Sequence, residues 1–253
     1  MKGILTFIGI LILGIFLSCS GKKNSSAEQE GTKQEAEVVQ ASEWISLFDG
    51  ETLNGWKRYH GDEIGPLWSV EDGAIKCDGQ GHGEGSPEFG GSLITLETFG
   101  NFELELEWKI SEGGNSGILY HVVEKPEYSH AYVTGPEFQV RDDGPADDTT
   151  STDKQMAGSN YDMYAAPPTK KLNPVGEWNT AKIVYNDGKV EHWLNGEKVV
   201  EFDENSEDFK ERFMQSKWSS GEYPHWNTYK EGSIALQDHG AAVWYRNIRL
   251  KKL

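Results

Sequence analysis

One short segment carries three polar side chains that could act on a single ligand. In an extended strand, successive side chains point to opposite faces, so Glu137, Gln139 and Arg141 share one face and Phe138 and Val140 share the other. A carboxylate, an amide and a guanidinium in one row suit a polyhydroxylated or carbonyl-bearing ligand. The alternative is an ordinary strand face in contact with solvent.

Two histidines could supply acid–base chemistry, because imidazole changes charge near neutral pH. His239 follows a predicted strand and stands next to Asp238, and strand ends often line functional sites. His121 follows Tyr120 within an apolar run. A histidine in such a run can equally be a core residue whose nitrogens are satisfied by hydrogen bonds.

Further binding groups are indicated in a glycine-rich turn and in an aromatic segment. Residues 113–117 read Gly-Gly-Asn-Ser-Gly, a tight backbone that a ligand can approach closely and that presents Asn115. Lys217 and Trp218 lie in a turn-rich stretch, where an exposed indole suits the face of a sugar ring. The same aromatic residues could instead fill the core of a β-sandwich.

No cofactor is specified by the sequence, although a divalent metal is one hypothesis. An acidic stretch offers the oxygen ligands that Ca²⁺ takes, at Asp142, Asp143, Asp147, Asp148 and Asp153. Its spacing matches no recognised calcium loop, so solvated carboxylates are the alternative. The sequence also lacks the zinc-protease, P-loop and serine-hydrolase motifs, so no familiar catalytic signature defines the chemistry.

The elements that must position these groups are predicted to be β-strands. Residues 102–110 alternate strictly between apolar and polar side chains, which is typical of a half-buried strand. Asp-Gly and Asn-Gly turns then join three more strands into a meander, because both turn residues tolerate positive φ. Further strands and one short helix complete the pattern: the meander covers 180–185, 189–194 and 198–202, other strands 117–123, 137–141, 233–237 and 243–250, and the helix 206–214. This pattern predicts an all-β sandwich of two antiparallel sheets in a single domain.

Composition narrows the classes of function. The 253 residues include 41 acidic and 24 basic side chains, a formal charge of -17. Such an acidic chain is repelled by nucleic acid and by anionic lipid surfaces. A hydrophobic content of 36% with nine tryptophans supports a full core, and two cysteines are too few for a disulfide-dependent fold.

The first 43 residues are predicted to target and tether the protein. Lys2 precedes an apolar run at residues 4–17, which is shorter than the roughly 20 residues of a membrane span and is typical of a signal peptide. The run ends in Phe-Leu-Ser-Cys, which resembles a loose bacterial lipobox, so we expect a signal peptide at 1–18 and lipidation of Cys19. Ordinary signal cleavage is the alternative. The polar residues 19–43 then form a flexible tether for a folded domain at 44–253.

Motifs spread over residues 44–253 resemble one family. They are Leu47-Phe48-Asp49-Gly50, Trp68-Ser69-Val70-Glu71-Asp72-Gly73, Gly114-Asn115-Ser116-Gly117-Ile118, Gly135-Pro136-Glu137-Phe138-Gln139-Val140, Gly176-Glu177-Trp178-Asn179, Trp193-Leu194-Asn195-Gly196 and Ile234-Ala235-Leu236-Gln237-Asp238-His239-Gly240. In this order they resemble the 3-keto-disaccharide hydrolase domain, also described as a 3-keto-glucoside 1,2-lyase and 3-keto-2-hydroxy-glucal hydratase domain. The resemblance implies a concanavalin-like jelly-roll sandwich, often in a bacterial cell-envelope lipoprotein, with sugars as ligands.

The substrate implied by this resemblance is a glycoside whose C3 has been oxidised to a ketone. The ketone acidifies the proton on C2, so a base can remove it while the group on C1 departs, and water can then add to the unsaturated sugar. We expect His239 or His121 to be the base, Glu137 to be the acid or a second base, and Gln139 and Arg141 to hold the ketone and hydroxyls.

Five further residues are expected to contact the substrate: Tyr120, Asn115, Asp238, Lys217 and Trp218. The alternative function is a non-catalytic carbohydrate-binding lipoprotein or a structural protein at the cell surface. On either interpretation we expect a protein of the bacterial envelope that touches the membrane only through its lipid anchor.

The anchor is directly testable. We expect Cys19→Ser to release the protein from the membrane fraction, because the thiol is the group that would be acylated. Fractionation followed by immunoblotting measures this, with Cys77→Ser as the matched control that stays membrane-bound. A Cys19→Ser protein that still fractionates with the membrane would place the anchor elsewhere.

Overall fold

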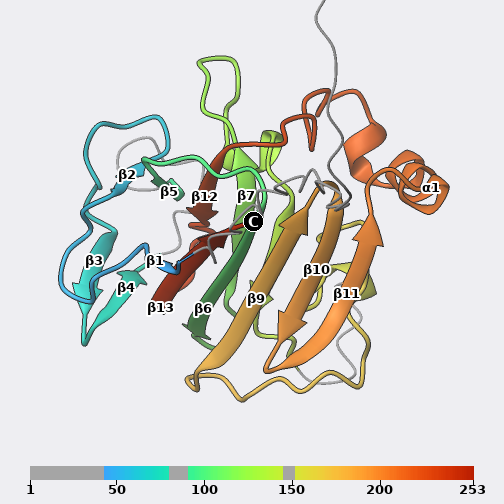
Figure 1. Cartoon of the computed structure of the whole chain (residues 1–253). Coiled ribbons are helices and arrows are strands. Elements are labelled where there is room, and N and C mark those ends of the chain that lie inside the picture. The colour runs from blue at the N-terminus through green and yellow to red at the C-terminus, as the bar shows by residue number, and fades with distance from the viewer. Residues whose placement is uncertain (1–42, 80–90, 145–151) are drawn as a thin grey trace, which may run out of the picture. The chain divides into compact units, whose positions relative to one another are not determined.

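The computed structural model describes residues 43–79, 91–144 and 152–253, which belong to one folded unit (Figure 1). The predicted signal peptide, Cys19 and the tether up to residue 42 lie outside the described residues, as do Asp147 and Asp148. Within the described part of the chain, no helix is long and apolar enough to span a membrane.

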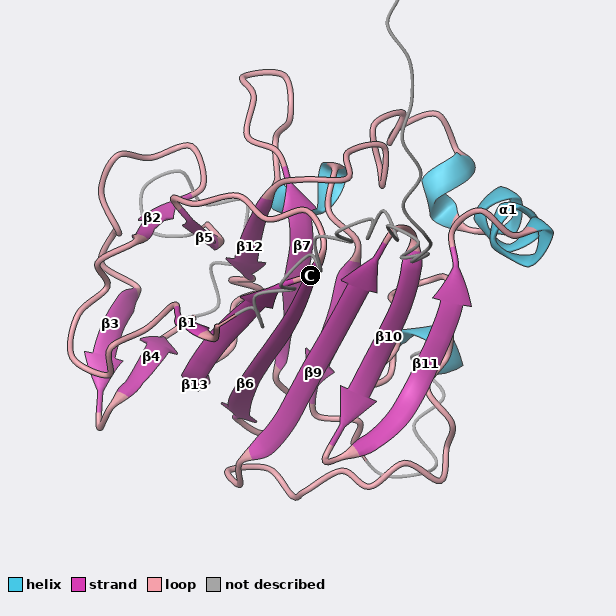
Figure 2. Ribbon diagram, in the orientation of Figure 1, coloured by secondary structure: helices cyan, strands magenta, loops and turns pink. Residues whose placement is uncertain are grey.

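Two antiparallel sheets form the domain, as the sequence predicted (Figure 2). The larger sheet contains β1 (Ile45–Ser46), β3 (Trp68–Glu71), β4 (Ala74–Cys77), β6 (Phe102–Ile110), β9 (Asn179–Asn186), β10 (Lys189–Leu194), β11 (Glu197–Asp203) and β13 (Val243–Lys252). The smaller sheet contains β2 (Trp56–Arg58), β5 (Leu93–Thr95), β7 (Asn115–Val122), β8 (Glu137–Arg141) and β12 (Ser233–Leu236). Their orders are β11-β10-β9-β6-β13-β4-β3, with β1 paired to β13, and β2-β5-β12-β7-β8. Jelly-roll sandwiches have this architecture.

In residues 43–79, 91–144 and 152–253, helical structure is confined to short segments. They are α1 (Glu207–Gln215) and the 3₁₀ turns η1 (Ala131–Val133), η2 (Asp153–Gln155) and η3 (Lys217–Ser219). The predicted helix is therefore confirmed, and Ser206 caps it by accepting a hydrogen bond from the backbone N–H of Phe209 at 3.1 Å. Side-chain capping of this kind satisfies an amide that has no partner within the helix.

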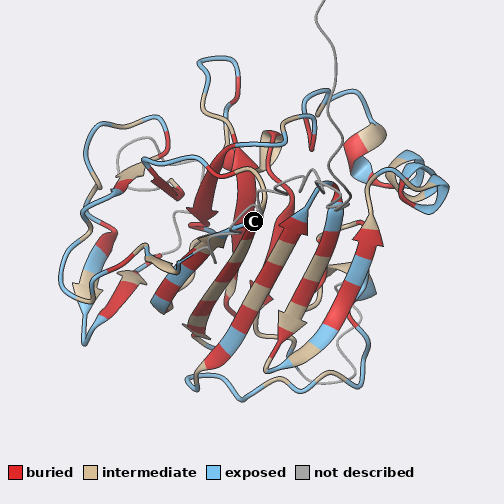
Figure 3. Cartoon of the chain, viewed as in Figure 1, coloured by how far each residue is buried: buried red, intermediate tan, exposed pale blue. Residues whose placement is uncertain are grey.

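Strand β6 shows why the alternating sequence pattern was informative. Its apolar residues at even positions are buried and its polar residues at odd positions are half-buried (Figure 3). It pairs with β9 on one side and β13 on the other. The meander beside it turns at Asp187-Gly188 and Asn195-Gly196, where all four residues have positive φ. Both hairpins were predicted for that reason.

The two sheets are joined by a hydrogen-bonded hydroxyl within the core. Ser116 of β7 is fully buried, and its Oγ donates to the carbonyl oxygen of Gln237 at 2.6 Å. The Tyr245 hydroxyl of β13 lies 2.7 Å from the same Oγ. Since a carbonyl can only accept, the serine proton is committed to Gln237, and Tyr245 donates to Ser116. One oxygen thereby joins β7, β13 and the end of β12.

This junction predicts a non-additive pair of substitutions. Ser116→Ala should lower the free energy of unfolding by about 2–6 kcal/mol, because two buried groups lose a partner at about 1–3 kcal/mol each. Tyr245→Phe should cost about 1 kcal/mol, since it removes a donor and leaves no polar group behind on the ring. The double variant should be no less stable than Ser116→Ala, as measured by urea unfolding. If the loss of unfolding free energy in the double variant equalled the sum of the losses in the two single variants, the shared hydrogen bond between Ser116 and Tyr245 would be contradicted.

Candidate active site

A pocket of about 190 Å³ opens on the face of the five-stranded sheet that is turned away from the other sheet. Ser116 and Phe138 point into the core between the sheets, so their chain neighbours on β7 and β8 point outward into the pocket. The lining residues are Asn115, Tyr132, Glu137, Gln139, Tyr161, Lys217, Trp218, Tyr223, Gln237 and His239. Six predicted site residues are thus brought together from β7, β8, η3 and the end of β12.

Glu137 lies in the pocket because the neighbouring strand has no side chain at position 117. A Cβ added to Gly117 would stand 2.3 Å from Oε1 of Glu137, so the carboxylate occupies the space over this glycine. Gly117 pairs with Gln139 in the register of β7 and β8, which sets Glu137 diagonally across from it. Only 6% of Glu137 is exposed, so its carboxylate is held in a largely water-excluded position.

A short relay of side chains connects β8 to His239. Nε2 of Gln139 donates to Oδ1 of Asn115 at 2.8 Å, which orients the asparagine amide. Nδ2 of Asn115 then faces Nδ1 of His239 at 3.4 Å. An amide nitrogen can only donate, so Nδ1 of the neutral histidine is the acceptor. The remaining proton of the imidazole is then on Nε2.

Two amide oxygens in this pocket are buried and have no protein partner. Oε1 of Gln139 and Oε1 of Gln237 accept no hydrogen bond, although the two residues are only 1% and 4% exposed. A buried carbonyl oxygen without a donor is costly, at about 1–3 kcal/mol, and such groups are rare in native proteins. Two in one pocket indicate that hydroxyl groups of a ligand or water molecules donate to them.

An aromatic wall with one ammonium group closes the other side of the pocket. Nζ of Lys217 lies 4.3 Å from the ring centroids of both Tyr161 and Trp218, and about 6 Å from those of Tyr132 and Tyr223. Stacking on aromatic faces holds an ammonium in place. Burial raises the pKa of Tyr161, so its phenol remains protonated at neutral pH.

Trp218 belongs to this wall and is held in place by packing in the core. Its ring stacks on Trp226 at 4.8 Å, and its Nε1 donates to the carbonyl oxygen of Tyr161 at 3.2 Å. The residue is 2% exposed, so it shapes the pocket while packing in the core. The structure shows the core-packing interpretation of this tryptophan, and its contact with a sugar ring stays a prediction.

Two predicted site residues lie in the interior, away from the pocket. His121 is fully buried and has a φ of 55°, its Nε2 is 2.9 Å from the carbonyl oxygen of Gly100, and its ring packs edge-on against Tyr185. Burial lowers the pKa of His121. Tyr120 is also fully buried, with its hydroxyl 3.5 Å from Nε2 of His192, and burial raises its pKa. The structure gives both residues a packing role.

Asp238 and Arg141 also differ from their expected roles as substrate contacts. Asp238 is fully buried, and its two oxygens accept hydrogen bonds from the backbone N–H groups of Gly91 and Gly240 at 3.1 and 3.0 Å. It therefore holds two chain segments together beside the pocket. Arg141, at the end of β8, donates to the carbonyl oxygens of Asp142 and Gln155 and does not line the pocket.

Two of the acidic residues proposed for a metal, Asp142 and Asp143, are engaged with protein groups, whereas Asp147 and Asp148 lie outside the described residues. Asp142 accepts from the backbone N–H groups of Gly113 and Gly144, and Asp143 accepts from Ala157 N–H and pairs with Lys170. Among the residues that the structure describes, no three His, Cys, Asp or Glu side chains are grouped so that they could hold a metal ion.

Sequence reasoning missed four residues of the pocket: Gln237, Tyr132, Tyr161 and Tyr223. Gln237 could have been chosen, because it lies two positions before His239 at the same strand end and alternation puts it on the outer face of the sheet. The three tyrosines come from η1 and from two loops, far apart in the chain. No local pattern connects them, since only the tertiary fold brings them to one pocket.

Comparison with known proteins identifies relatives over the whole folded unit. The family model of the 3-keto-alpha-glucoside-1,2-lyase-like domain matches residues 43–251. A Bacteroides thetaiotaomicron protein named 3-keto-disaccharide hydrolase is 38% identical over 279 aligned positions, which cover 96% of each chain. A candidate glycosyl hydrolase from Parabacteroides distasonis is 39% identical, with a TM-score of 0.73 over 83% of this chain and 94% of that one. A second crystal structure from that organism is 25% identical, with a TM-score of 0.61 over 83% of this chain and 100% of that one.

The family match spans the strands, the pocket and every motif that suggested the resemblance, and the identity to the Bacteroides protein extends over nearly the full length. This chain belongs to the 3-keto-alpha-glucoside-1,2-lyase-like domain family.

Proposed function

We propose that this protein is an enzyme that cleaves the glycosidic bond of 3-keto-glycosides, by elimination across C1 and C2 followed by addition of water. The observation that carries the proposal is the convergence of a buried carboxylate, an oriented imidazole and two unpartnered amide oxygens in one pocket. Family membership supports the same chemistry, because the Bacteroides relative is named a 3-keto-disaccharide hydrolase. The pocket alone would also suit a sugar-binding protein.

Glu137 is the base in this proposal. Its carboxylate is nearly buried and fixed over Gly117, so little solvent competes for the proton on C2 of the sugar. Removal of that proton leaves the electron pair as an enolate across C2 and C3. The pair then forms the C1–C2 double bond as the C1–O bond breaks. The base needs no covalent bond to the substrate, so one carboxylate is sufficient.

His239 is the acid that protonates the departing oxygen. The neutral imidazole gives up its Nε2 proton and is left as imidazolate until a water proton restores it during hydration. Its Nδ1 accepts from Asn115, which leaves the proton on Nε2 and directs that nitrogen to donate. This assignment reverses the initial expectation of a histidine base, because the relay from Gln139 through Asn115 selects the tautomer. Hydration runs the same two groups in reverse: His239 takes a proton from water as it adds to C1, and Glu137 returns one to C2.

The remaining polar groups bind the sugar. The unpartnered oxygens of Gln139 and Gln237 accept hydrogen bonds from hydroxyl groups of the sugar. Because these amides are neutral, they bind hydroxyl groups without attracting cations. The ammonium of Lys217 provides positive charge for the enolate oxygen at C3, where negative charge develops in the transition state. The tyrosines around it, Tyr132, Tyr161 and Tyr223, provide apolar faces for the ring of the sugar.

We also propose that the enzyme works in the bacterial cell envelope, held there through Cys19. The short apolar run, the cysteine that follows it and the polar residues 19–43 support this location. A glycoside at the envelope would then reach the pocket without crossing into the cytoplasm.

Substitution of the two acid–base groups tests the proposal. Glu137→Gln and His239→Ala should each lower the turnover of a 3-keto-glucoside by about 100-fold or more, the usual contribution of an acid–base group. Release of the aglycone and of the keto-sugar is followed by chromatography. His225→Ala is the matched control, since His225 is an exposed histidine that does not line the pocket. Its turnover should equal that of the wild type.

Three results would contradict the enzymatic proposal or its assignments. A wild-type protein that binds a 3-keto-glucoside without consuming it would be a binding protein. Full activity in Glu137→Gln and His239→Ala would place the chemistry on other residues. Exchange of the C2 proton with solvent deuterium that persists in Glu137→Gln but stops in His239→Ala would return the base role to the histidine.

The space over Gly117 gives a second test of Glu137. Gly117→Ala should lower turnover by about 10- to 100-fold, because the new Cβ displaces the carboxylate from its position and misplacement of about 1 Å can have that effect. Gly100→Ala is the control, since its Cβ would meet only the Lys230 carbonyl oxygen at 3.6 Å. Thermal unfolding should show both variants folded, and full turnover in Gly117→Ala would mean that the carboxylate position is not required.

A further inference from the structure

A second and larger hollow lies on the outer face of the eight-stranded sheet. It encloses about 820 Å³, compared with about 190 Å³ for the pocket described above. A β-bulge helps to form it: the pairing of β13 with β6 shifts between Arg246 and Arg249, and Asn247 has a φ of 53°. Bulges redirect side chains and often occur beside functional sites.

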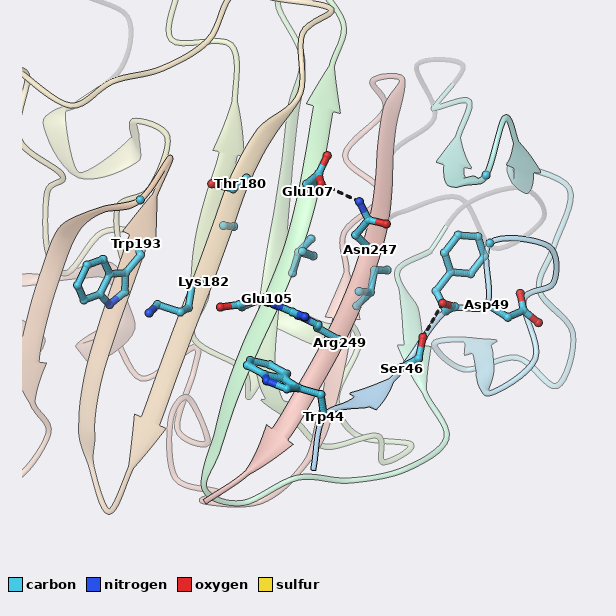
Figure 4. A pocket seen from close by; sticks show the side chains of 17 residues that line it. Trp44, Ser46, Asp49, Glu105, Glu107, Thr180, Lys182, Trp193, Asn247 and Arg249 are labelled. Atoms are coloured by element: carbon cyan, nitrogen blue, oxygen red, sulfur yellow. Dashed lines mark hydrogen bonds and ion pairs between the residues drawn. The ribbon is translucent and has the colours of Figure 1, made fainter. Parts of the chain in front are cut away.

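Two half-buried tryptophans stand on either side of the centre of this hollow. In Figure 4, Trp193 of β10 and Trp44 lie on either side of Lys182 and Glu105. The Lys182 ammonium is 4.3 Å from the Trp193 ring centroid, and the Arg249 guanidinium is 4.5 Å from that of Trp44. These contacts restrain the indoles before any ligand binds, which reduces the entropy lost on binding.

The charges on the floor of the hollow are compensated within the protein. Arg249 pairs with Glu105 at 2.5 Å, and Glu107 pairs with Arg246 at 2.7 Å and accepts from Nδ2 of Asn247 at the same distance. The floor therefore carries many hydrogen-bonding groups but no uncompensated patch of one sign. An anionic or cationic polymer would gain little attraction there, whereas hydroxyl groups could both donate and accept.

We propose that this hollow is a second carbohydrate-binding site, which takes a neutral glycan chain and performs no chemistry. Restrained indoles offer apolar surface to the C–H faces of sugar rings, and the paired acids and bases between them offer partners for equatorial hydroxyls. The volume lies within the range of specific ligand sites. The site is distinct from the candidate active site, because the two open on the outer faces of different sheets.

Binding of cellohexaose and maltohexaose, two neutral gluco-oligosaccharides, tests this site by isothermal titration calorimetry. Trp193→Ala should weaken the binding of at least one of them by 10-fold or more, whereas Trp244→Ala should not. Trp244 is a half-buried tryptophan of the same sheet that stacks with Lys109 and lies outside the hollow. Glu105→Gln and Glu103→Gln form a second matched pair, since both lie on β6 but only Glu105 lines the hollow.

The controls separate this site from the active site. Trp193→Ala should turn over a 3-keto-glucoside as the wild type does, and Glu137→Gln should still bind the oligosaccharide. Affinity should be unchanged between 50 mM and 500 mM NaCl, because a neutral ligand is not screened. Three outcomes would each overturn the proposal. The wild type could fail to bind, Glu137→Gln could lose binding while Trp193→Ala retains it, or sedimentation could show a dimer formed through this face.

Discussion

The arrangement of the candidate site depends on one buried oxygen, that of Ser116. This oxygen accepts a hydrogen bond from Tyr245 of β13 in the larger sheet and donates one to the carbonyl group of Gln237 at the end of β12. It therefore sets the position of β7 relative to β13 and to the end of β12. Of the residues on either side of Ser116, Asn115 lines the pocket, and Gly117 leaves the space that the carboxylate of Glu137 occupies. A change between the sheets would therefore move the groups on the outer face.

The polar side chains of the pocket differ in kind from those on the outer face of the larger sheet. Across the outer face of the larger sheet, acids and bases are matched in ion pairs, as in Glu105 with Arg249 and Glu103 with Lys182. The lining of the pocket includes three neutral amides and four aromatic side chains, with Lys217 and Glu137 as charged groups. In a protein with a formal charge of -17, such a pocket presents hydrogen-bonding groups to an uncharged sugar while the ammonium attracts developing negative charge.

Much of the fold could be predicted, because its signals are local. Alternation over residues 102–110 and the Asp-Gly and Asn-Gly turns depend on neighbours within a few residues, and the structure confirms each of them. The short strands β1 to β5 were not identified individually, since two to four residues carry no period that could be measured. The pairing of β1, β2 and β5 depends on tertiary contacts.

The site could be predicted where a strand's alternation, the end of a strand or a turn-rich segment revealed it, as turn-rich segments did for Asn115, Lys217 and Trp218. Glu137, Gln139 and His239 follow such local rules and line the pocket. His121 does not line it, because the backbone at a φ of 55° turns that residue into the core, and no sequence pattern indicates this conformation in advance. Arg141 was also expected in the row, but at the end of β8 its guanidinium is engaged by loop carbonyl groups.

The position of the pocket on one outer face of the sandwich has a practical consequence. The opposite outer face, with its lysines on β9 and β11, is remote from Glu137 and His239. Covalent coupling to a solid support through engineered groups on that face would leave the mouth of the pocket open to small molecules in the surrounding solution. An immobilised form of the protein could thus be built by choosing the sheet through which it is attached.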